Sequence, residues 1–555
     1  MQQKHKFLAS ALEKLHSKNE DFIIFGLTGR TGSGCTTAAN YLSSEKKDID
    51  HCFFTENNPT DNFQRKEKII AKFYEKNWQP FIHLQVSSIL TLMFLCHSCK
   101  DELHEFFNSN KFINNDEVDF LLSTKNHLDT KEQELDKNDF NFYITCLNQA
   151  TKNIRTKLGE ANFIKLYQLL GKNARSSGKV TDSTLIGGEF FTIALEIKKV
   201  IEQLHHAQKK LNKNTYITID AIRNPLEASY FQERFASFYL LAISCDNDVR
   251  IKRLKDKGLS DETIEFIDEN EYASLDIDDE SSFTGQDIQG CLQKADIYID
   301  SNEKKDNYNS KKLLVNQLIK FVCLAQKPGL ITPSPEERCM QVAYTSKLNS
   351  GCISRQVGAV VTKNNFSIKA VGWNDTPYGQ VPCKLRSYED LYEGKDTDAY
   401  SSYELKTEVF RTKIRSKIEL LRPLESKGYN HSYCFKSEYN LIKGGNNQVH
   451  TRSLHAEENA FLQVSKDGGS GVEGGYLFTT ASPCELCAKK AYQLGMTKIF
   501  YIDPYPGISF EHILSSGTKE RQPQMVLFNG AIGRAFHNLY TPIVPYKDEL
   551  KALMQ

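Results

Sequence analysis

The chain has 555 residues, a length that favours two or three domains over one. Lysine plus arginine equals aspartate plus glutamate at 70 each, so bulk charge gives no reason to expect a polyanion such as duplex DNA or RNA as partner. The 14 cysteines are spread along the chain, and no signal segment opens it. We therefore expect a cytoplasmic protein in which clustered cysteines bind metal or take part in chemistry.

The first half of the sequence alternates short apolar runs with long polar stretches. The runs at 21–29, 214–225 and 238–244 are expected to be buried parallel strands of an α/β sheet. The most apolar run, 81–96, is too short and too interrupted by polar residues to span a bilayer, so we expect no membrane partner. The acidic stretch 276–287 is expected to be a solvated loop or lid.

A glycine-rich loop, "GRTGSGCT" at 29–36, follows the first of these strands and precedes a helical stretch. It matches the phosphate-loop pattern G-x-x-x-x-G-K-[ST], except that Cys35 stands in place of the lysine. The backbone N–H groups and the helix N-terminus suit a phosphate, and Thr36 with Asp220 could hold Mg²⁺. A thiol does not replace the lysine, so we expect nucleotide binding without kinase activity. The residues assigned to this site are Gly29, Gly32, Gly34, Cys35, Thr36 and Asp220.

Two further segments, 220–228 and 248–258, resemble parts of P-loop nucleotide kinases in which arginines contact phosphates. The alternative is a glycine turn in an inherited scaffold that binds nothing. Prolines and a glycine then collect between 325 and 335, as at a domain boundary. We therefore predict a P-loop kinase-like domain over 1–325 and a second α/β domain over 326–555.

The second half contains four apolar runs with strand character, at 356–362, 366–374, 474–480 and 498–502. Two helical patterns lie among them, "HAEENAFLQVS" and "PCELCAKKAYQLG". Ser482 and Glu485 fit a capping box for the second helix, with Pro483 as its first residue. Cys484 and Cys487 would then lie one turn apart near the helix N-terminus, which favours thiolate.

These two helices carry the H-x-E and P-C-x-x-C halves of the zinc deaminase signature. His455, Cys484 and Cys487 are the predicted zinc ligands, and 28 residues separate the first from the second. One imidazole and two thiolates leave a fourth position of a tetrahedral site for water. Glu457 is the predicted proton shuttle. The alternative is a closed structural zinc site, which would leave Glu457 without a role.

Residues 334–545 resemble the deoxycytidylate deaminase family, and the similarity extends beyond the zinc signature. The segment 354–380 resembles that family's "VGAVIV … GYNGxPxG" stretch, and 503–518 resembles the segment after its last catalytic helix. The resemblance implies a three-layer α/β/α cytidine-deaminase-like domain. It also implies substrate contacts from the side chain of Asn374 and from main-chain groups near Ala456 and Ser482.

A second zinc site is a weaker prediction, because some deoxycytidylate deaminases carry a structural zinc held by cysteines in comparable places. Cys352 and Cys383 flank the substrate-like segment, and His431, Cys434 and His450 could complete the site. The alternative is that the two cysteines are buried small side chains.

The fusion of a P-loop domain to such a deaminase resembles the bacterial anti-phage dCTP deaminases. It implies an oligomeric enzyme that converts dCTP or dCMP to the deoxyuridine nucleotide and ammonia and so depletes deoxycytidine nucleotides during infection. A regulatory nucleotide or inhibitory partner would control it. Two alternatives stay open: a deaminase acting on tRNA or single-stranded DNA, which should show a basic channel with aromatics, and a nucleotide-sensing switch whose deaminase half is inactive.

Overall fold

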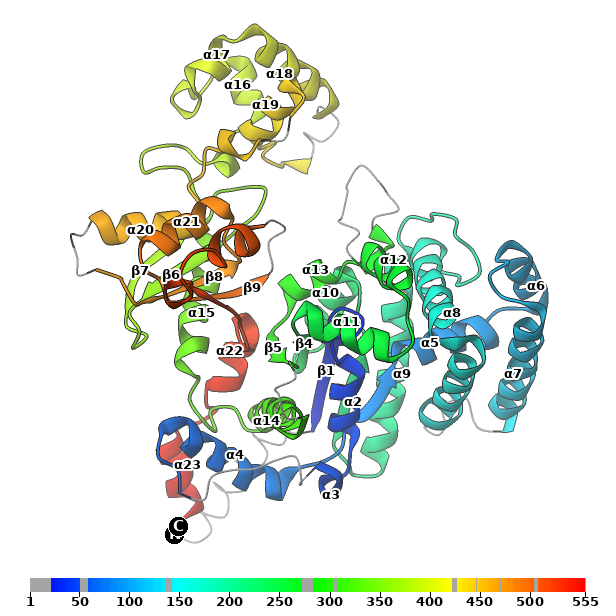
Figure 1. Cartoon of the computed structure of the whole chain (residues 1–555). Coiled ribbons are helices and arrows are strands. Elements are labelled where there is room, and N and C mark those ends of the chain that lie inside the picture. Colours follow the sequence, from blue (N-terminus) through cyan, green and yellow to red (C-terminus); the bar gives the residue numbers. More distant parts are fainter. Residues whose placement is uncertain are drawn as a thin grey trace. The chain divides into compact units, whose positions relative to one another are not determined.

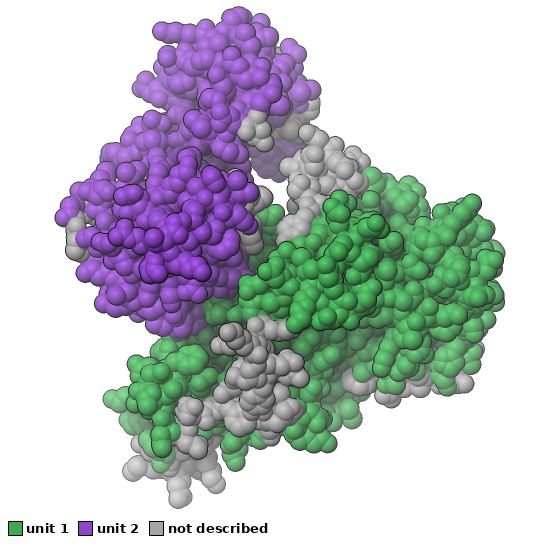
Figure 2. Space-filling model, in the orientation of Figure 1, with its two compact units in different colours: residues 1–333, 529–555 green, residues 334–528 purple. Residues whose placement is uncertain are grey.

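The computed structural model describes residues 21–49, 58–134, 142–271, 283–302, 307–421, 427–445, 447–466, 468, 471–503 and 508–554. The chain divides into two compact units, one formed by 1–333 with 529–555 and the other by 334–528 (Figure 2). The break falls in the proline-rich stretch where the sequence indicated a boundary. The extreme C-terminal segment, however, belongs to the first unit and not to the second. Most of the acidic stretch 276–287 lies outside the described residues.

The first unit is built on a six-stranded sheet in the order β11-β5-β4-β1-β3-β2. Five neighbouring strands, β5, β4, β1, β3 and β2, run parallel to one another, and β11 is antiparallel to β5. The sheet contains the strands expected at 21–29, 214–225 and 238–244. The strand bounds are β1 Phe22–Thr28, β2 Ile82–Gln85, β3 Thr215–Asp220, β4 Phe238–Ser244, β5 Ile297–Asp300 and β11 Gly530–Ala531.

Helices cover both faces of this sheet, which is why its strands read as continuous apolar runs. Ile23, Phe25 and Leu27 of β1 pack in one cluster with residues of α2, α4, α14 and α22 (Figure 1). The helices of this unit are α2 Cys35–Ser43, α3 Lys46–Ile49, α4 Asn62–Asn77, α5 Val86–Thr91, α6 Lys100–Ser109, α7 Asn115–Glu134, α8 Asn148–Ser177, α9 Thr192–Lys210, α10 Pro225–Arg234, α11 Asn247–Asp256, α12 Asp261–Glu271, α13 Ile288–Lys294, α14 Asn307–Gln326, α22 Gly533–Tyr540 and α23 Tyr546–Leu553.

The C-terminal segment completes the first unit through a very short strand. Gly530 of β11 pairs with Tyr298 of β5, and Ile532 donates its backbone N–H to Asp296 O at 3.0 Å. Ala535 and Leu539 of α22 are fully buried in the same core as β1. A two-residue strand has no periodicity, so its sequence could not indicate this pairing.

The apolar run 81–96 is one strand followed by helix, because β2 leads directly into α5 and then a π-helical turn, Leu92–Cys96. Leu84, Ile89 and Phe94 are buried. Among the described residues, no helix combines the length and apolar character needed to cross a bilayer.

The second unit contains a mixed five-stranded sheet in the order β10-β9-β8-β6-β7. β6 is antiparallel to both β7 and β8, whereas β8, β9 and β10 are parallel. These strands include the four expected from the sequence. Their bounds are β6 Gly358–Thr362, β7 Ile368–Trp373, β8 Tyr476–Ala481, β9 Lys498–Asp503 and β10 Gln524–Leu527.

Helices lie on both faces of this second sheet, so the unit has three layers (Figure 1). Ala359 and Val361 of β6 pack with Ala460 and Ala488 from α20 (Ala456–Lys466) and α21 (Glu485–Gln493). Val360, between them in sequence, is fully buried on the other face of the strand, where α15 (Pro335–Ser346) packs. The expected mixed α/β architecture is therefore confirmed.

A helical insertion between β7 and α20 was not predicted. It holds α16 Tyr388–Glu393, α17 Ser402–Lys406, α18 Glu408–Leu421 and α19 Phe435–Lys443. Leu391, Phe410 and Tyr433 form its own small core. Buried Arg386 bonds to the carboxylate of Glu404, which is also fully buried, so the pair satisfies two charges inside that core. The amphipathic pattern of residues 408–421 could have indicated a helix of this insertion.

Candidate active site

The two halves of the H-x-E and P-C-x-x-C signature meet at one end of the second sheet. His455 immediately precedes α20, and Glu457 lies in the first turn of that helix. Strand β8 ends at Ala481, and Cys484 is the N-cap residue of α21. Both helices therefore begin at this edge, and each contributes its first residues to the site.

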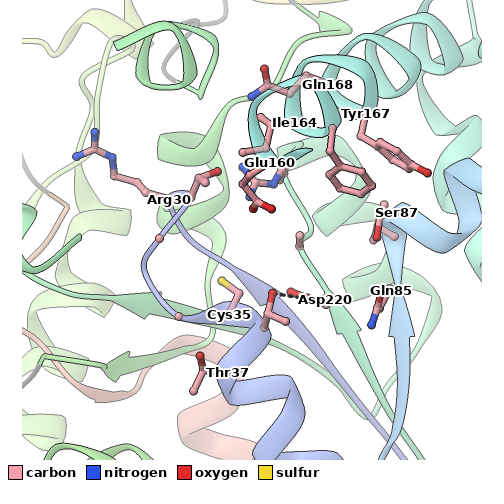
Figure 3. A pocket seen from close by; sticks show the side chains of 18 of the residues that line it. Arg30, Cys35, Thr37, Gln85, Ser87, Glu160, Ile164, Tyr167, Gln168 and Asp220 are labelled. Atoms are coloured by element: carbon pink, nitrogen blue, oxygen red, sulfur yellow. Dashed lines mark hydrogen bonds between the residues drawn. The ribbon is translucent and has the colours of Figure 1, made fainter. Parts of the chain in front are cut away.

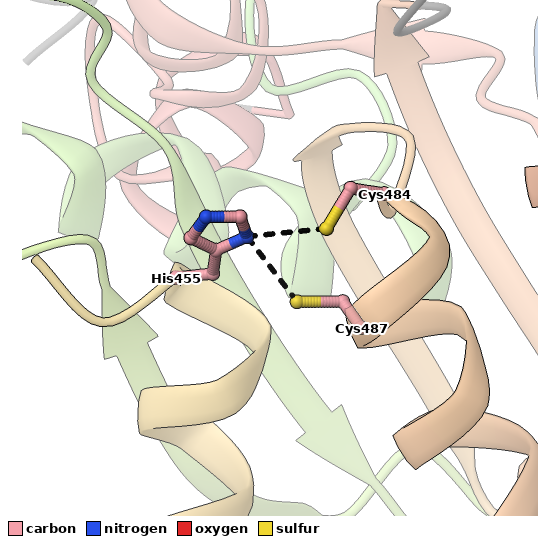
Figure 4. A group of neighbouring side chains, drawn as sticks. All are labelled: His455, Cys484 and Cys487. Carbon is pink, nitrogen blue, oxygen red and sulfur yellow. Dashed lines mark hydrogen bonds between the residues drawn. The ribbon is translucent and has the colours of Figure 1, made fainter. Parts of the chain in front are cut away.

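His455, Cys484 and Cys487 form a compact set of donor atoms (Figure 4). The Nδ1 atom of His455 lies 3.3 Å from the Cys484 sulfur and 3.5 Å from the Cys487 sulfur. A tetrahedral zinc with Zn–S and Zn–N bonds of about 2.3 and 2.0–2.1 Å places such atoms about 3.5 Å apart. The three side chains therefore fit a zinc ion and leave its fourth position free of these ligands.

The ligand side chains share their protons. Hydrogen bonds from the Cys487 thiol and from His455 lower the pKa of Cys484 to about 3, although burial opposes this. The hydrogen bond to Cys484 likewise raises the pKa of His455. The low pKa of Cys484 favours its thiolate form before metal binds. Zinc binding releases the remaining protons, because ligation needs deprotonated donors.

Glu457 lies beside the donor set but is not part of it. Among the described residues, the only group of three or more such donors within 4.8 Å of one another is His455, Cys484 and Cys487. Glu457 is 4% exposed, and its Oε1 lies 3.0 Å from the hydroxyl of Thr479 on β8. Burial raises the pKa of the Glu457 carboxyl. A buried, oriented carboxyl next to a metal site is suited to proton transfer.

Comparison with known proteins agrees with this geometry. Residues 333–503 match the family model for the cytidine and deoxycytidylate deaminase zinc-binding region. Over 170 residues the chain is 31% identical to deoxycytidylate deaminase of Enterobacteria phage T2, covering 30% of this chain and 78% of that protein. The chain belongs to the deoxycytidylate deaminase family. The matched region contains His455, Glu457, Cys484 and Cys487.

Other members of this deaminase family are also similar to the second unit. The deoxycytidylate deaminase of Enterobacteria phage T4 is 29% identical over 166 residues, which cover 30% of this chain and 76% of that protein. The crystal structure of dCMP deaminase from cyanophage S-TIM5 in complex with dCMP and dUMP is 23% identical and covers 36% of this chain and 99% of that one, with a TM-score of 0.22.

The start of α21 differs from the expectation for this deaminase. The helix begins at Glu485 with Cys484 as N-cap, so the predicted Ser482–Glu485 capping box with Pro483 as first helical residue was wrong. Cys484 has extended backbone angles, φ −68° and ψ 172°, which delay the helix. Glu485 instead accepts the backbone N–H of Ile508 at 3.1 Å. Cys484 and Cys487 nevertheless remain one turn apart.

The residues assigned to substrate contact lie near the site in different settings. The Asn374 amide accepts the backbone N–H of Val357 at 2.7 Å and donates to Arg355 O at 2.6 Å, so it fixes the start of β6. Ala456 is fully buried, and Ser482 donates its backbone N–H to Asp503 O at 2.8 Å. Substrate contact by Asn374, Ala456 and Ser482 stays a prediction.

Thr479 is a positioning residue that the sequence analysis missed. Its hydroxyl lies 3.0 Å from Glu457 Oε1 and 2.7 Å from Ala481 O, and the side chain is fully buried. We expect Thr479→Val, which keeps the shape, to lower kcat by about 10–150-fold because a hydrogen bond to a charged group is worth about 1.5–3 kcal/mol. Steady-state kinetics on zinc-loaded protein test this, and unchanged kcat would assign the hydroxyl to folding alone.

The predicted second zinc site is less compact. The thiols of Cys383 and Cys434 are hydrogen-bonded, which lowers the pKa of Cys434 to about 5, and Cys352 lies near enough to influence Cys383 electrostatically. His431 Nδ1 bonds to Glu389, whereas its buried Nε2 has no hydrogen-bond partner among the described residues. The donor atoms of the predicted second site are not gathered within 4.8 Å of one another as those of His455, Cys484 and Cys487 are.

A second zinc therefore remains a prediction that the metal content of the purified protein decides. If it binds, we expect two zinc ions per chain, and Cys352→Ser should lower this ratio by one without loss of deaminase activity. Elemental analysis gives the ratio directly. One zinc per chain in the wild type would leave Cys352 and Cys383 as small buried or half-buried thiols.

The glycine-rich loop of the first unit lies where the chain changes direction in the sheet. After β1 the chain forms β2 and β3 on one side of that strand, and then β4 and β5 on the other. Open α/β sheets bind ligands outside the carboxyl ends of the strands at such a switch point. The loop has this position, and Gly32 and Gly34 have φ of 90° and 109°, which side-chain-bearing residues rarely adopt.

The side chains of this loop are gathered largely as the sequence predicted. Thr36 donates its hydroxyl hydrogen bond to Asp220 Oδ2 at 2.9 Å, so the proposed Mg²⁺ ligands are neighbours. Burial, followed by the charge of Asp220, raises the pKa of Cys35 to about 12. Cys35 is therefore a neutral thiol and cannot supply the charge of a phosphate-loop lysine. Nucleotide binding by Gly29 and the rest of the loop is a proposal.

Charged side chains hold the loop, two of them arginines from the segments 220–228 and 248–258 and one, Glu271, that was not found from the sequence. The backbone N–H of Thr31 donates to both carboxylate oxygens of Glu271, at 3.0 and 3.1 Å, and Arg223 bonds to the same buried group. Arg253 donates to Ser33 O at 3.3 Å. Arginines thus hold loop carbonyls from one side, while a carboxylate occupies a loop N–H. No sequence pattern connects residues 240 positions apart.

Proposed function

We propose that the chain catalyses the hydrolytic deamination of a deoxycytidine nucleotide, dCMP or dCTP, to the deoxyuridine nucleotide and ammonia. The observation that carries this proposal is the triad of His455, Cys484 and Cys487 with buried Glu457 beside it. A structural zinc site would use a fourth protein ligand and would not require a proton-transfer group. Relatives named deoxycytidylate deaminases support the substrate class.

In the proposed mechanism, His455, Cys484 and Cys487 would hold a zinc ion, which would supply an activated water for attack on C4 of cytosine. Glu457 accepts a proton from that water and delivers it to N3 of the ring. It then transfers the second proton to the exocyclic amino group, which leaves as ammonia. Thr479 holds the carboxyl in one orientation, and the buried position of Glu457 keeps bulk water from exchanging those protons.

A panel of substrates tests the proposal. We expect ammonia release from dCMP or dCTP and little from cytidine, CMP or a cytosine-containing oligonucleotide. Comparable kcat/KM for the oligonucleotide would favour the polynucleotide deaminase. If zinc-replete protein deaminates none of these substrates, the result would favour the alternative of a nucleotide-sensing protein whose deaminase site is inactive. A strong chelator should abolish the activity, and subsequent addition of zinc should restore it.

We propose that the glycine-rich loop binds a regulatory nucleotide together with Mg²⁺ through Thr36 and Asp220, without phosphoryl transfer. The hydrogen bond between these two side chains and the position of the loop after β1 support this. The neutral Cys35 argues against transfer, because no lysine charge is available at that position. A nucleotide bound here would alter deamination only by favouring one conformational state of the chain.

The biological role we propose is depletion of deoxycytidine nucleotides during phage infection by a cytoplasmic homo-oligomer. The resemblance of the chain to anti-phage dCTP deaminases supports it. Loss of protection against phage in cells carrying an inactive variant tests this role separately from the chemistry.

A further inference from the structure

The cavity at the glycine-rich loop is larger than phosphate binding requires. It has a volume of about 570 Å³ and reaches from the loop to the end of β2 and along α8. This volume falls within the range of about 300–1,000 Å³ that is typical of small-molecule sites. Figure 3 shows Glu160, Ile164 and Gln168 of α8 on one side of the cavity and Cys35 on the other.

The loop end of the cavity offers cationic and N–H groups to an anion. Six cationic and three acidic side chains line the cavity; four of the cationic ones form ion pairs, Arg30 with Asp268, Arg155 with Glu160, Arg175 with Glu227 and Arg223 with Glu271, and Arg253 bonds to the loop at Ser33 O. The orphan N–H groups of the first turn of α2 add partial positive charge beside Gly34. The phosphates of a ligand would therefore lie at this end. The cationic residues are Arg30, Arg155, Arg175, Arg223, Arg253 and Lys257.

The part of the cavity between α5 and α8 has a different chemistry. Leu90 and Ile164 are apolar, and the guanidinium of Arg155 lies over the ring of Phe163, 4.4 Å from its centroid. Phe163 in turn stacks on Tyr167, with ring centroids 4.1 Å apart. Arginine planes and aromatic rings of this kind are common stacking surfaces for nucleobases.

One carboxamide oxygen at this part of the cavity has no partner. Gln168 lines the cavity, and its buried Oε1 makes no hydrogen bond with any described residue. Buried polar atoms normally have partners, so this oxygen would gain one if the carboxamide turned toward a ligand in the cavity. Asp220 Oδ1, at the other end, is also buried without a hydrogen-bond partner among these residues. A carboxamide pairs well with the edge of a nucleobase.

We propose that one nucleotide fills both parts of this cavity, with its phosphates at the glycine-rich loop and its base between Leu90, Ile164 and the plane of Arg155. Gln168 bonds to the edge of the base. The inference rests on the anion-binding role proposed for the loop and extends it, since the pocket recognises a base and not only a polyphosphate. Binding would thus respond to the balance among nucleotides in the cell.

Equilibrium binding to the full-length chain tests this. The probes are dCTP, dATP, dGTP, dTTP and inorganic tripolyphosphate, each with Mg²⁺, in a Glu457→Ala background that prevents turnover. Nucleotide binding that is lost in the Gly34→Val variant is assigned to the glycine-rich loop. We expect at least one nucleotide to bind there tenfold or more tightly than tripolyphosphate, and the four nucleotide arms identify the preferred base.

Gln168→Leu should lower that preference by roughly tenfold, the effect of about one hydrogen bond, and leave tripolyphosphate binding within twofold. Arg155→Gln, at a half-exposed position, should act in the same direction with little risk to folding. The control is Gln149→Leu, on the exposed side of α8, which should change nothing. Equal affinity for tripolyphosphate and every nucleotide, or an unchanged preference in both variants, would overturn base recognition while leaving the loop proposal intact. Absence of all loop-dependent binding would overturn both.

Discussion

Glu457→Ala is expected to lower kcat for deamination by about 10²–10⁴-fold, the usual contribution of general acid–base catalysis. The same carboxyl is assigned both proton transfers, so its removal affects both steps. Zinc should stay bound, because His455, Cys484 and Cys487 are unchanged. The measurements are kcat with dCMP and dCTP and the zinc-to-protein ratio of the same preparation.

Two further variants make the Glu457 result specific. Glu457→Gln keeps the volume and the neighbouring Thr479, so it should lose activity as strongly as alanine without leaving a cavity. Glu458→Gln is the matched control, because the adjacent Glu458 pairs with Lys490 at a partly exposed position and is not one of the triad's donors. We expect its kcat to remain within twofold of wild type. Wild-type turnover by zinc-replete Glu457→Gln would show that the proton shuttle is a different group.

The deaminase site could be predicted from sequence because its chemistry depends on short-range spacing. H-x-E places a ligand and a carboxyl on the same helix start, and C-x-x-C places two thiols one turn apart. These relations survive even though α21 begins at Glu485, two residues later than expected. The main strands were predictable for a related reason, since burial on both faces produces continuous apolar runs.

The features that were missed depend on contacts between distant parts of the chain. Pairing of Gly530 with Tyr298 joins residues of the C-terminal segment to the first sheet, and neither residue has a distinctive pattern. The contact of Glu271 with Thr31 is similar, since an acidic residue at the end of a polar helix is usually solvated. The helical insertion was missed because it interrupts the alternation of strands and helices. Its 408–421 segment is nevertheless amphipathic.

Gly34→Val is expected to abolish detectable nucleotide binding at the loop of the first unit. Gly34 is the N-cap of α2 and has φ 109° and ψ 16°, a conformation that a β-branched residue adopts only with strain. The new side chain would also lie where a phosphate must approach the backbone. Isothermal titration with Mg²⁺ and the nucleotides measures binding, and ATP hydrolysis should be undetectable in wild type as well as in the variant.

The effect of Gly34→Val on deamination separates regulation from inherited structure. Coupling between two sites typically changes affinity by about 5–150-fold, so added nucleotide should shift the apparent KM of wild type by an amount in that range and leave the variant unaffected. Gly188→Val is the matched control, because Gly188 has a similar φ of 104° and has open space around the position of a β-carbon. Its deamination should respond to nucleotide as wild type does. If Gly34→Val binds nucleotide normally and its deamination responds as in wild type, the loop is an inherited turn, because neither binding nor regulation then depends on it.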